Sequence, residues 1–239
     1  MIAAEFRKLR TVRSTWLLLI TAQLVVVAGV SGLMVSQSDA LGPDGQRDAI
    51  AHAGLVSIFA LVLGILAVAG EYRHRTITDT YLTEPRRERV VLAKLAVNVV
   101  AGLVFGLVAA TVAVAATAIW VTAKGGAMAW NGDLWQAVGG AVGWNVAFAA
   151  LGVGIGALVT NPLAAIAGSL AWIALVEGIV GQLIEDATRW LPFRLGPALE
   201  GLAGRGEFPP AWQAALALGG YVVAFVVAAV ATTIRRDVS

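Results

Sequence analysis

Long apolar runs constrain this chain more than any other feature of its sequence. A run of about 20 apolar residues matches the roughly 30 Å of hydrocarbon in a bilayer. Hydrophobic residues make up 59% of the chain and charged residues 13%, whereas soluble domains carry about 25% charged residues. The sequence therefore predicts an all-α integral membrane protein with a single transmembrane domain over residues 1–239. Its six predicted spans lie at residues 16–35, 50–70, 95–122, 134–159, 163–184 and 211–234.

Residues 1–14 precede the first span and are rich in basic side chains. Ile2, Phe6 and Leu9 fall on one face at helical spacing, which predicts an amphipathic helix in the membrane surface whose basic side chains reach lipid phosphates. The alternative is that this segment is only the positive flank of the first span. The first apolar run is too long for a usual signal-peptide core, so we expect it to remain as a span.

The segments between the other spans carry turn signals. Residues 36–49 predict a polar loop with a turn at residues 42–45, and Asn161-Pro162 predicts a tight turn. Residues 185–210 contain four prolines and several charges, so they are predicted to form an external segment rather than a span.

Basic residues give the orientation. With six spans, both termini lie on one side, and twelve of the 17 Lys and Arg residues then lie on that side. The positive-inside rule places that side in the cytoplasm. Tryptophans near the predicted span ends fit an aromatic belt; they are Trp16, Trp120, Trp135, Trp190 and Trp212.

The loop between the second and third spans, residues 71–94, is the one long charged segment. We expect the second helix to continue to Arg73 and a short helix to follow over Thr76–Leu82, with Ile77 and Tyr81 on one face. Thr83 is a candidate N-cap and Pro85 suits the first turn of the next helix. A helical cap of this kind offers apolar side chains to a partner's groove and arginines to orient it. The alternative is an ordinary basic cytoplasmic loop.

EFRKLRTVRSTWLLL near the start, and EYRHRTITDTYLTEPRRERVVLAKL after the second span, resemble the ABC-2 class of ABC transporter permeases. The family's acidic residue, threonine, Pro-x-x-Arg-like stretch and basic residue fall at Glu71, Thr76, Pro85 with Arg86 to Arg89, and Lys94. Arg75 stands where the family usually has glycine. The resemblance covers the whole chain in the number and order of spans.

The resemblance implies partners. Such permeases form homodimers or heterodimers in a bacterial cell membrane and bind two cytoplasmic P-loop ATPase subunits through this loop, the coupling helix. The residues implied in coupling are Glu71, Arg75, Thr76, Ile77, Tyr81, Pro85, Arg86, Arg89 and Lys94. This chain has no G-x-x-x-x-G-K-[ST] stretch, so ATP and Mg²⁺ would be bound by the partner. It is not expected to be an enzyme or to bind a cofactor or nucleic acid. It is not expected to hold a metal, because His52 and His74 are isolated.

Glu177 is the one ionisable residue well inside a predicted span, where a carboxylate costs about 2.5–3.5 kcal/mol. One interpretation is a cavity-lining residue that meets cargo, together with Trp172 and Asn145. The alternative is that Glu177 lies near the external end and reaches water, or is protonated and hydrogen-bonded to a neighbour such as Gln182. Asn98 and Asn145 are also typical of hydrogen bonds between helices. The GxxxG pairs at Gly102/Gly106, Gly139/Gly143 and Gly152/Gly156 are expected to pack helices within the subunit.

The expected function is the membrane-spanning permease of an ATP-driven exporter that forms its substrate pathway as a dimer. A non-transporting scaffold or sensor that recruits a cytoplasmic protein through residues 71–94 is the alternative from another class. A membrane-embedded enzyme is third, because no nucleophile–base arrangement is present.

Overall fold

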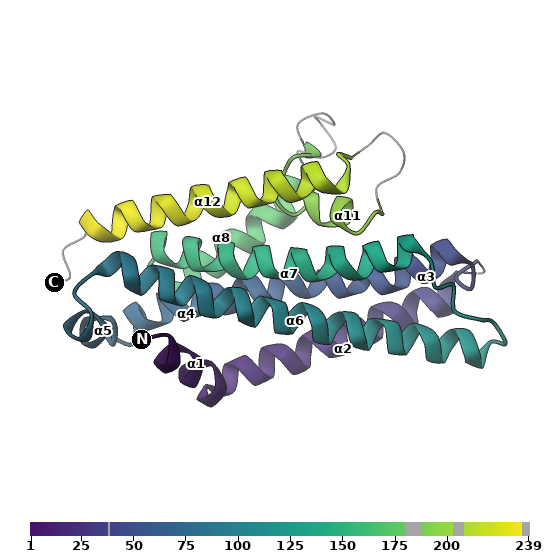
Figure 1. Cartoon of the computed structure of the whole chain (residues 1–239), viewed down its shortest axis with the longest axis horizontal. Coiled ribbons are helices and arrows are strands. Elements are labelled where there is room, and N and C mark those ends of the chain that lie inside the picture. Colours follow the sequence, from purple (N-terminus) through teal and green to yellow (C-terminus); the bar gives the residue numbers. More distant parts are fainter. Residues whose placement is uncertain (38, 180–187, 203–207, 236–239) are drawn as a thin grey trace.

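The computed structural model describes residues 1–37, 39–179, 188–202 and 208–235, and these residues are helical with no strand among them. Figure 1 shows the helices arranged as an elongated bundle. The elements are α1 (Ile2–Thr11), α2 (Arg13–Ser36), α3 (Pro43–Ile50), η1 (Ala51–Val56), α4 (Ser57–Arg73), α5 (Ile77–Thr83), α6 (Arg87–Ala123), α7 (Gly132–Leu158), α8 (Pro162–Ala171), η2 (Trp172–Glu177), α11 (Leu195–Leu199) and α12 (Ala211–Arg235).

Five helical segments of the described chain are long and apolar enough to cross a membrane. They are Arg13–Ser36, Pro43–Arg73, Arg87–Ala123, Gly132–Leu158 and Ala211–Ile234. The 37-residue α6 would be about 55 Å long at 1.5 Å per residue, so it projects beyond the hydrocarbon. α6 begins at Arg87, which is eight residues before the predicted start of this span at residue 95.

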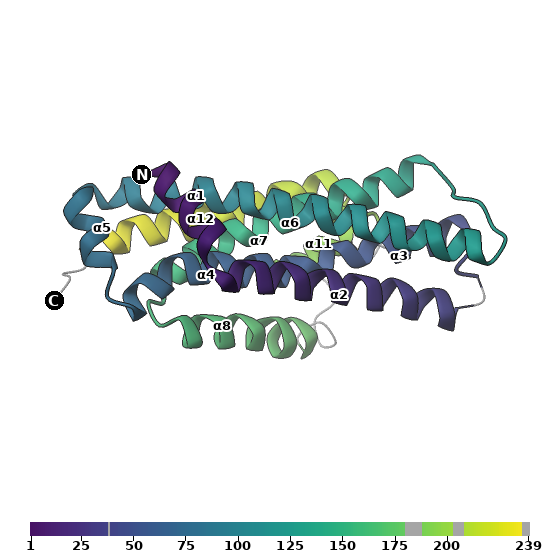
Figure 2. The ribbon, with the colours of Figure 1, turned by 90° about the horizontal axis from the view of Figure 1, so that it is seen from below.

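The predicted fifth span, residues 163–184, is described only as far as residue 179. α8 and the π-helix η2 cover Pro162–Glu177, which is below the length needed to cross by itself. The rest of that predicted span, together with Gln182, falls largely outside the described residues. Figure 2 shows α8 running along one side of the bundle, where it contacts α4 and α7. Met1 and the last turns of α12 lie at the same end of the bundle in Figures 1 and 2.

The second spanning segment starts earlier than its apolar run. Pro43 occupies the first helical turn of α3, where its missing N–H costs nothing, and a 3-10 turn, η1, joins α3 to α4. The prediction of a polar loop over residues 36–49 is therefore wrong from Pro43 onward, where α3 begins. The Gln46 side chain holds α3 through bonds with the Leu41 and Ala127 carbonyls.

α7 lies at the centre and packs against α4, α6 and α12. Glycine permits this packing: a methyl group at Gly152 or Gly156 would overlap the α4 backbone, and one at Gly102 or Gly106 would crowd α7. Those two GxxxG pairs therefore pack helices within the subunit, as expected. The third pair, Gly139 and Gly143, faces open space, because a methyl group on either residue would meet no other atom within 4 Å.

Asn161 ends the turn between α7 and α8 as the sequence predicted. Its side-chain oxygen accepts hydrogen bonds from the backbone N–H groups of Leu163 and Ala164 at 3.0 and 3.2 Å. Pro162 takes the first helical position. Together these residues satisfy the N-terminal donors of α8, which have no partner inside the helix.

Candidate functional site

Two lysines and two glutamates from three helices form a charge cluster, buried except for Lys8, at the end of the bundle where Met1 and the last turns of α12 lie. We call Glu5, Lys8, Glu71 and Lys94 the Lys94 cluster. The Lys94 ammonium donates to Glu5 at 2.9 Å, to Glu71 at 2.7 Å and to the Ala67 carbonyl at 3.0 Å. Lys8 donates to the same carboxylates at 2.7 and 2.5 Å. The two ammonium groups therefore share two carboxylates with no excess charge.

The local sequence explains how these groups meet. Glu5 and Lys8 are three residues apart on α1 and so share one helix face. Glu71 lies in the last turn of α4, and Lys94 is the eighth residue of α6. A break at Val12, whose backbone is extended, turns α1 away from α2 and lets it lie across α4 and α6.

The cluster also reaches the loop helix α5. The Thr80 hydroxyl donates to the second carboxylate oxygen of Glu71 at 3.2 Å. Lys94 is 1% exposed and Glu71 is 9% exposed, so both depend on these charge-assisted bonds rather than on water. One set of hydrogen bonds thereby joins α1, α4, α5 and α6.

The charges shift the pKa values of the α1 side chains. Burial raises the pKa of Glu5, but the ammonium groups of Lys94 and Lys8 outweigh it, so the pKa of Glu5 lies below its usual 4.5. Burial lowers the pKa of Lys8, but Glu5 and Glu71 outweigh it, so the pKa of Lys8 lies above its usual 10.5. Both shifts favour the charged cluster in the folded chain.

These directions predict how docking of α1 depends on pH. The lowered pKa of Glu5 contributes stability above pH 4.5 that is lost as pH falls through its folded value. The raised pKa of Lys8 contributes stability below pH 10.5 that is lost as pH rises through its folded value. We therefore expect α1 to stay docked between these limits and to detach in acid. A fluorophore on an Ile2→Cys variant of this cysteine-free chain would report it, and Glu5→Gln should weaken docking and remove the acid transition. Acid release that is unchanged by Glu5→Gln would contradict this assignment.

The loop helix α5 is held by its own side chains. Ile77 is 4% exposed and packs inward, and the Tyr81 hydroxyl lies 3.2 Å from that of Tyr72. The Arg87 guanidinium lies over the Tyr81 ring, 5.1 Å from its centre. Burial, followed by the hydrogen bond with Tyr72, raises the pKa of Tyr81 well above 10. The short helix is where the sequence predicted it, but Ile77 is not free to enter a partner's groove.

Arg75 forms the turn between α4 and α5 in a left-handed backbone conformation, with φ of 57°. The resemblance led us to expect glycine at this position, and glycine adopts this conformation freely, whereas a side chain disfavours it by roughly 1–2 kcal/mol. The Thr76 N–H closes the turn on the Glu71 carbonyl at 3.0 Å.

Replacement of Arg75 by glycine is expected to raise the free energy of unfolding by about 1 kcal/mol, because it removes this strain. Arg75→Val should lower it, since a β-branched side chain suits the left-handed region least. Thermal unfolding of the purified variants measures both. Arg73→Gly, in the last turn of α4, is the matched control and should be destabilising. A lower melting temperature for Arg75→Gly than for the parent would contradict the strain.

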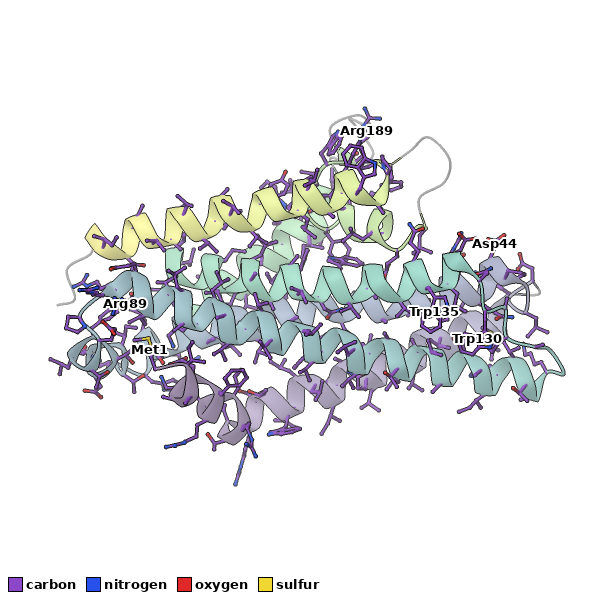
Figure 3. All side chains as sticks on the ribbon, in the orientation of Figure 1. Met1, Asp44, Arg89, Trp130, Trp135 and Arg189 are labelled. Atoms are coloured by element: carbon purple, nitrogen blue, oxygen red, sulfur yellow. The ribbon has the colours of Figure 1, made fainter. Side chains whose placement is uncertain are left out.

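The exposed part of this loop differs from the predicted coupling set. Glu71, Ile77 and Lys94 are buried and present no surface to a partner. Leu82 is 77% exposed and was not singled out by the sequence. We define the basic end surface as the exposed residues Arg73, Arg75, Leu82, Arg86 and Arg89. Figure 3 places Arg89 at the same end as Met1, opposite Asp44.

Two predicted cap positions are wrong by a few residues. Thr83 closes α5 instead of starting the next helix, and its hydroxyl donates to the Thr80 carbonyl at 2.8 Å. α6 starts at Arg87 with Arg86 as its N-cap, so Pro85 lies just outside the first turn. Glu84 explains the shift, because its carboxylate accepts a hydrogen bond from the Arg86 backbone N–H at 3.3 Å.

Glu177, the last residue of η2, is bonded to the segment that the sequence predicted to be external. Its carboxylate accepts hydrogen bonds from the Phe193 N–H at 3.0 Å, the Arg194 N–H at 3.1 Å and the Trp172 indole at 3.1 Å. Glu177 is 2% exposed. These donors favour the interpretation in which Glu177 is hydrogen-bonded, with backbone N–H groups as partners in place of the expected Gln182.

The structure separates Asn145 from Glu177 and Trp172. Asn145 is fully buried, and its amide donates to the Ala53 and Ala141 carbonyls at 3.2 and 2.9 Å. It joins α7 to η1, which is the interhelical role that the sequence suggested. Asn145 does not line the cavity that contains Trp172 and Glu177, and its place in a substrate pathway stays a prediction.

Sequence reasoning missed two buried carboxylates. Glu5 stood within a basic segment, where its three-residue spacing from Lys8 was the available signal. Glu200 follows α11, is 1% exposed and sits against Gly54, where a methyl group would overlap its carboxylate. Burial raises the pKa of Glu200 well above its usual value, and the Gly54 backbone N–H opposes this. Nothing in the local sequence distinguishes Glu200 from an ordinary loop residue.

The comparisons with known proteins agree with the resemblance noted from residues 71–94. The family model described as ABC-2 family transporter protein matches residues 1–180, which is most of the chain. A search of the curated proteins finds no significant match. The matched region includes the whole Lys94 cluster, α5 and the first four spanning segments. The chain therefore belongs to the ABC-2 family of transporter proteins, in which it is a permease.

Proposed function

We propose that this chain is the membrane-spanning subunit of an ATP-driven exporter, with its substrate pathway formed by two permeases. Cytoplasmic P-loop ATPase subunits would bind ATP and Mg²⁺ and dock on the basic end surface. The observation that carries the proposal is the Lys94 cluster, because it connects α5 to the helices that enter the membrane.

A docked partner would press on the exposed side of α5. Its inner side is anchored by Ile77, and by Thr80 through Glu71. Lys94 then joins Glu71 to α6, whose helix runs without interruption from Arg87 to Ala123. A displacement of α5 would thereby move the cytoplasmic ends of α4 and α6 together.

The N-terminal helix gives this unit a position at the membrane. Ile2 and Phe6 are exposed on α1, whereas Glu5 is buried in the cluster. An apolar exposed face favours α1 lying in the bilayer surface. α1 would then keep α5 at a constant distance from the bilayer surface while the spanning helices move.

The basic side chains support a cytoplasmic location for this end. Arg7, Arg10 and Arg13 are exposed near α1, and Arg73, Arg75, Arg86 and Arg89 are exposed near α5. The positive-inside rule favours the cytoplasm for such a concentration. An acidic rim around an apolar pocket on the ATPase would complement the arginines and Leu82.

Purification of the chain from its native membrane tests the proposal. We expect a subunit with a G-x-x-x-x-G-K-[ST] stretch to co-purify and the complex to hydrolyse ATP in vesicles. Recovery of the intact chain without any ATPase, under conditions that preserve other ABC complexes, would favour the scaffold function instead.

A further inference from the structure

A cavity of about 400 Å³ lies between α8 and the rest of the bundle. Residues from α4, α7, α8, η2 and α12 line it, and its volume is within the range of about 300–1,000 Å³ for small-molecule sites. The side chains that shape it include Leu61, Phe148, Leu151, Trp172, Ile173 and Phe225.

Two polar residues that line this cavity, Glu177 and Ser169, are already hydrogen-bonded to protein groups. Glu177 lines it, but its two oxygens accept the N–H groups of Phe193, Arg194 and Trp172. The Ser169 hydroxyl donates to the Ala165 carbonyl at 2.8 Å. Tyr221 contributes an aromatic ring. A charged ligand would therefore lose its hydration without gaining an unbonded carboxylate, which is unfavourable.

The π-helix η2 explains why the Glu177 carboxylate is hydrogen-bonded to the Trp172 indole. Trp172 and Glu177 are five residues apart, and the i to i+5 spacing of a π-turn brings such residues onto one face. The indole N–H can then reach the carboxylate while the ring faces the cavity. Short π segments are frequent at functional sites.

The cavity opens along α8 toward an apolar surface. Two of its lining residues, Val159 and Trp172, are 40% and 48% exposed. Leu163 and Leu175 on the same helical segment are 72% and 58% exposed. In a permease this apolar surface lies in the hydrocarbon of the bilayer, so a ligand enters from lipid rather than from water.

We propose that this cavity binds the uncharged hydrocarbon chain of a membrane amphiphile. Binding rests on the cavity alone, whereas export of the bound amphiphile rests on the proposed function. The cavity selects the hydrocarbon chain of the amphiphile rather than its headgroup, because the side chains that line the cavity are mostly apolar.

Photolabelling of the purified full-length chain in lipid nanodiscs tests the binding. The probe is phosphatidylcholine with a diazirine on one C16 acyl chain, and adducts are mapped by mass spectrometry. We expect adducts on α8, η2 and the facing part of α12, and we expect unlabelled hexadecane to compete. Gly168→Trp should remove them, because Gly168 lines the cavity and a Cβ at this position would meet no other atom within 4 Å.

Gly219→Trp is the matched control. Gly219 also has open space where a Cβ would lie but does not line the cavity, so labelling should persist. A melting temperature for each variant shows whether it is folded, and hexadecane competition in the parent chain gives an answer that needs no variant.

Two single-chain C16 diazirine probes, one with a trimethylammonium and one with a maltoside headgroup, separate chain from charge. We expect equal labelling of the cavity by both. If the two-chain lipid also labels the cavity, bilayer lipid is a source of the bound chain. If only the single-chain probes label it, the source is an exchanging amphiphile. Both results place a hydrocarbon chain in the cavity. Absence of adducts, adducts that survive Gly168→Trp, or a strong preference for the cation would overturn the proposal. None of these outcomes depends on an ATPase, so the proposed transport function is tested separately.

Discussion

Replacement of Lys94 by methionine is expected to lower the free energy of unfolding by about 3–5 kcal/mol, the range found when one partner of a buried ion pair is removed. The substitution keeps most of the side-chain volume but removes the ammonium that bonds Glu5, Glu71 and the Ala67 carbonyl. Lys8 is half-exposed and cannot neutralise two buried carboxylates by itself. Thermal unfolding in detergent should show a decrease on the order of 10 °C.

Lys124→Met is the matched control, because it makes the same change at the exposed C-terminal end of the same helix. The Lys124 ammonium bonds the Met34 carbonyl rather than a buried carboxylate. Exposed charges contribute about 1 kcal/mol or less, so its effect should be small. The triple variant Glu5→Gln, Glu71→Gln, Lys94→Met removes the unpaired charges and should recover part of the loss. Equal melting temperatures for Lys94→Met and the parent would show that the cluster does not hold α1 to the bundle.

Charge reversal at Arg86 and Arg89 is expected to abolish binding of the proposed ATPase partner without unfolding the permease. Both side chains are exposed on the basic end surface, and opposed like charges at an interface suppress association. Co-purification of the ATPase with an Arg86→Glu, Arg89→Glu variant measures the effect. Asp44→Arg, an exposed charge reversal at the opposite end of the bundle (Figure 3), should leave binding intact.

Leu82 gives a second measure of the same surface. Leu82→Asp should weaken ATPase binding by roughly 30-fold or more if Leu82 fills a pocket as an interface hot spot. Its melting temperature should not change, since Leu82 is 77% exposed. Ile77→Asp should behave oppositely and destabilise the fold, because Ile77 is 4% exposed. Full ATPase recovery and activity with both the Arg86/Arg89 and the Leu82 variants would remove the basic end surface from the coupling mechanism.

The spanning helices follow from sequence because a bilayer imposes a length and a composition on each one. Five helices of sufficient length, the Asn161-Pro162 turn and the helix at α5 all appear where local patterns predicted them. The predicted fifth span remains untested as a crossing, since η2 ends at Glu177 and the structure describes only two residues beyond it before residue 188. Hydropathy did not indicate that α3 would extend the second segment back to Pro43, beyond its apolar run.

The sequence by itself determined the family, the apolar helices and the position of the charged loop, since each depends on residues close together in the chain. Only the tertiary structure decided which charged residues face a partner and which face each other. Glu5 and Lys94 are 89 residues apart and meet at 2.9 Å, and Glu177 is bonded to backbone groups 16 and 17 residues away. Such pairings depend on how helices pack, and helix packing is set by contacts that no local pattern contains.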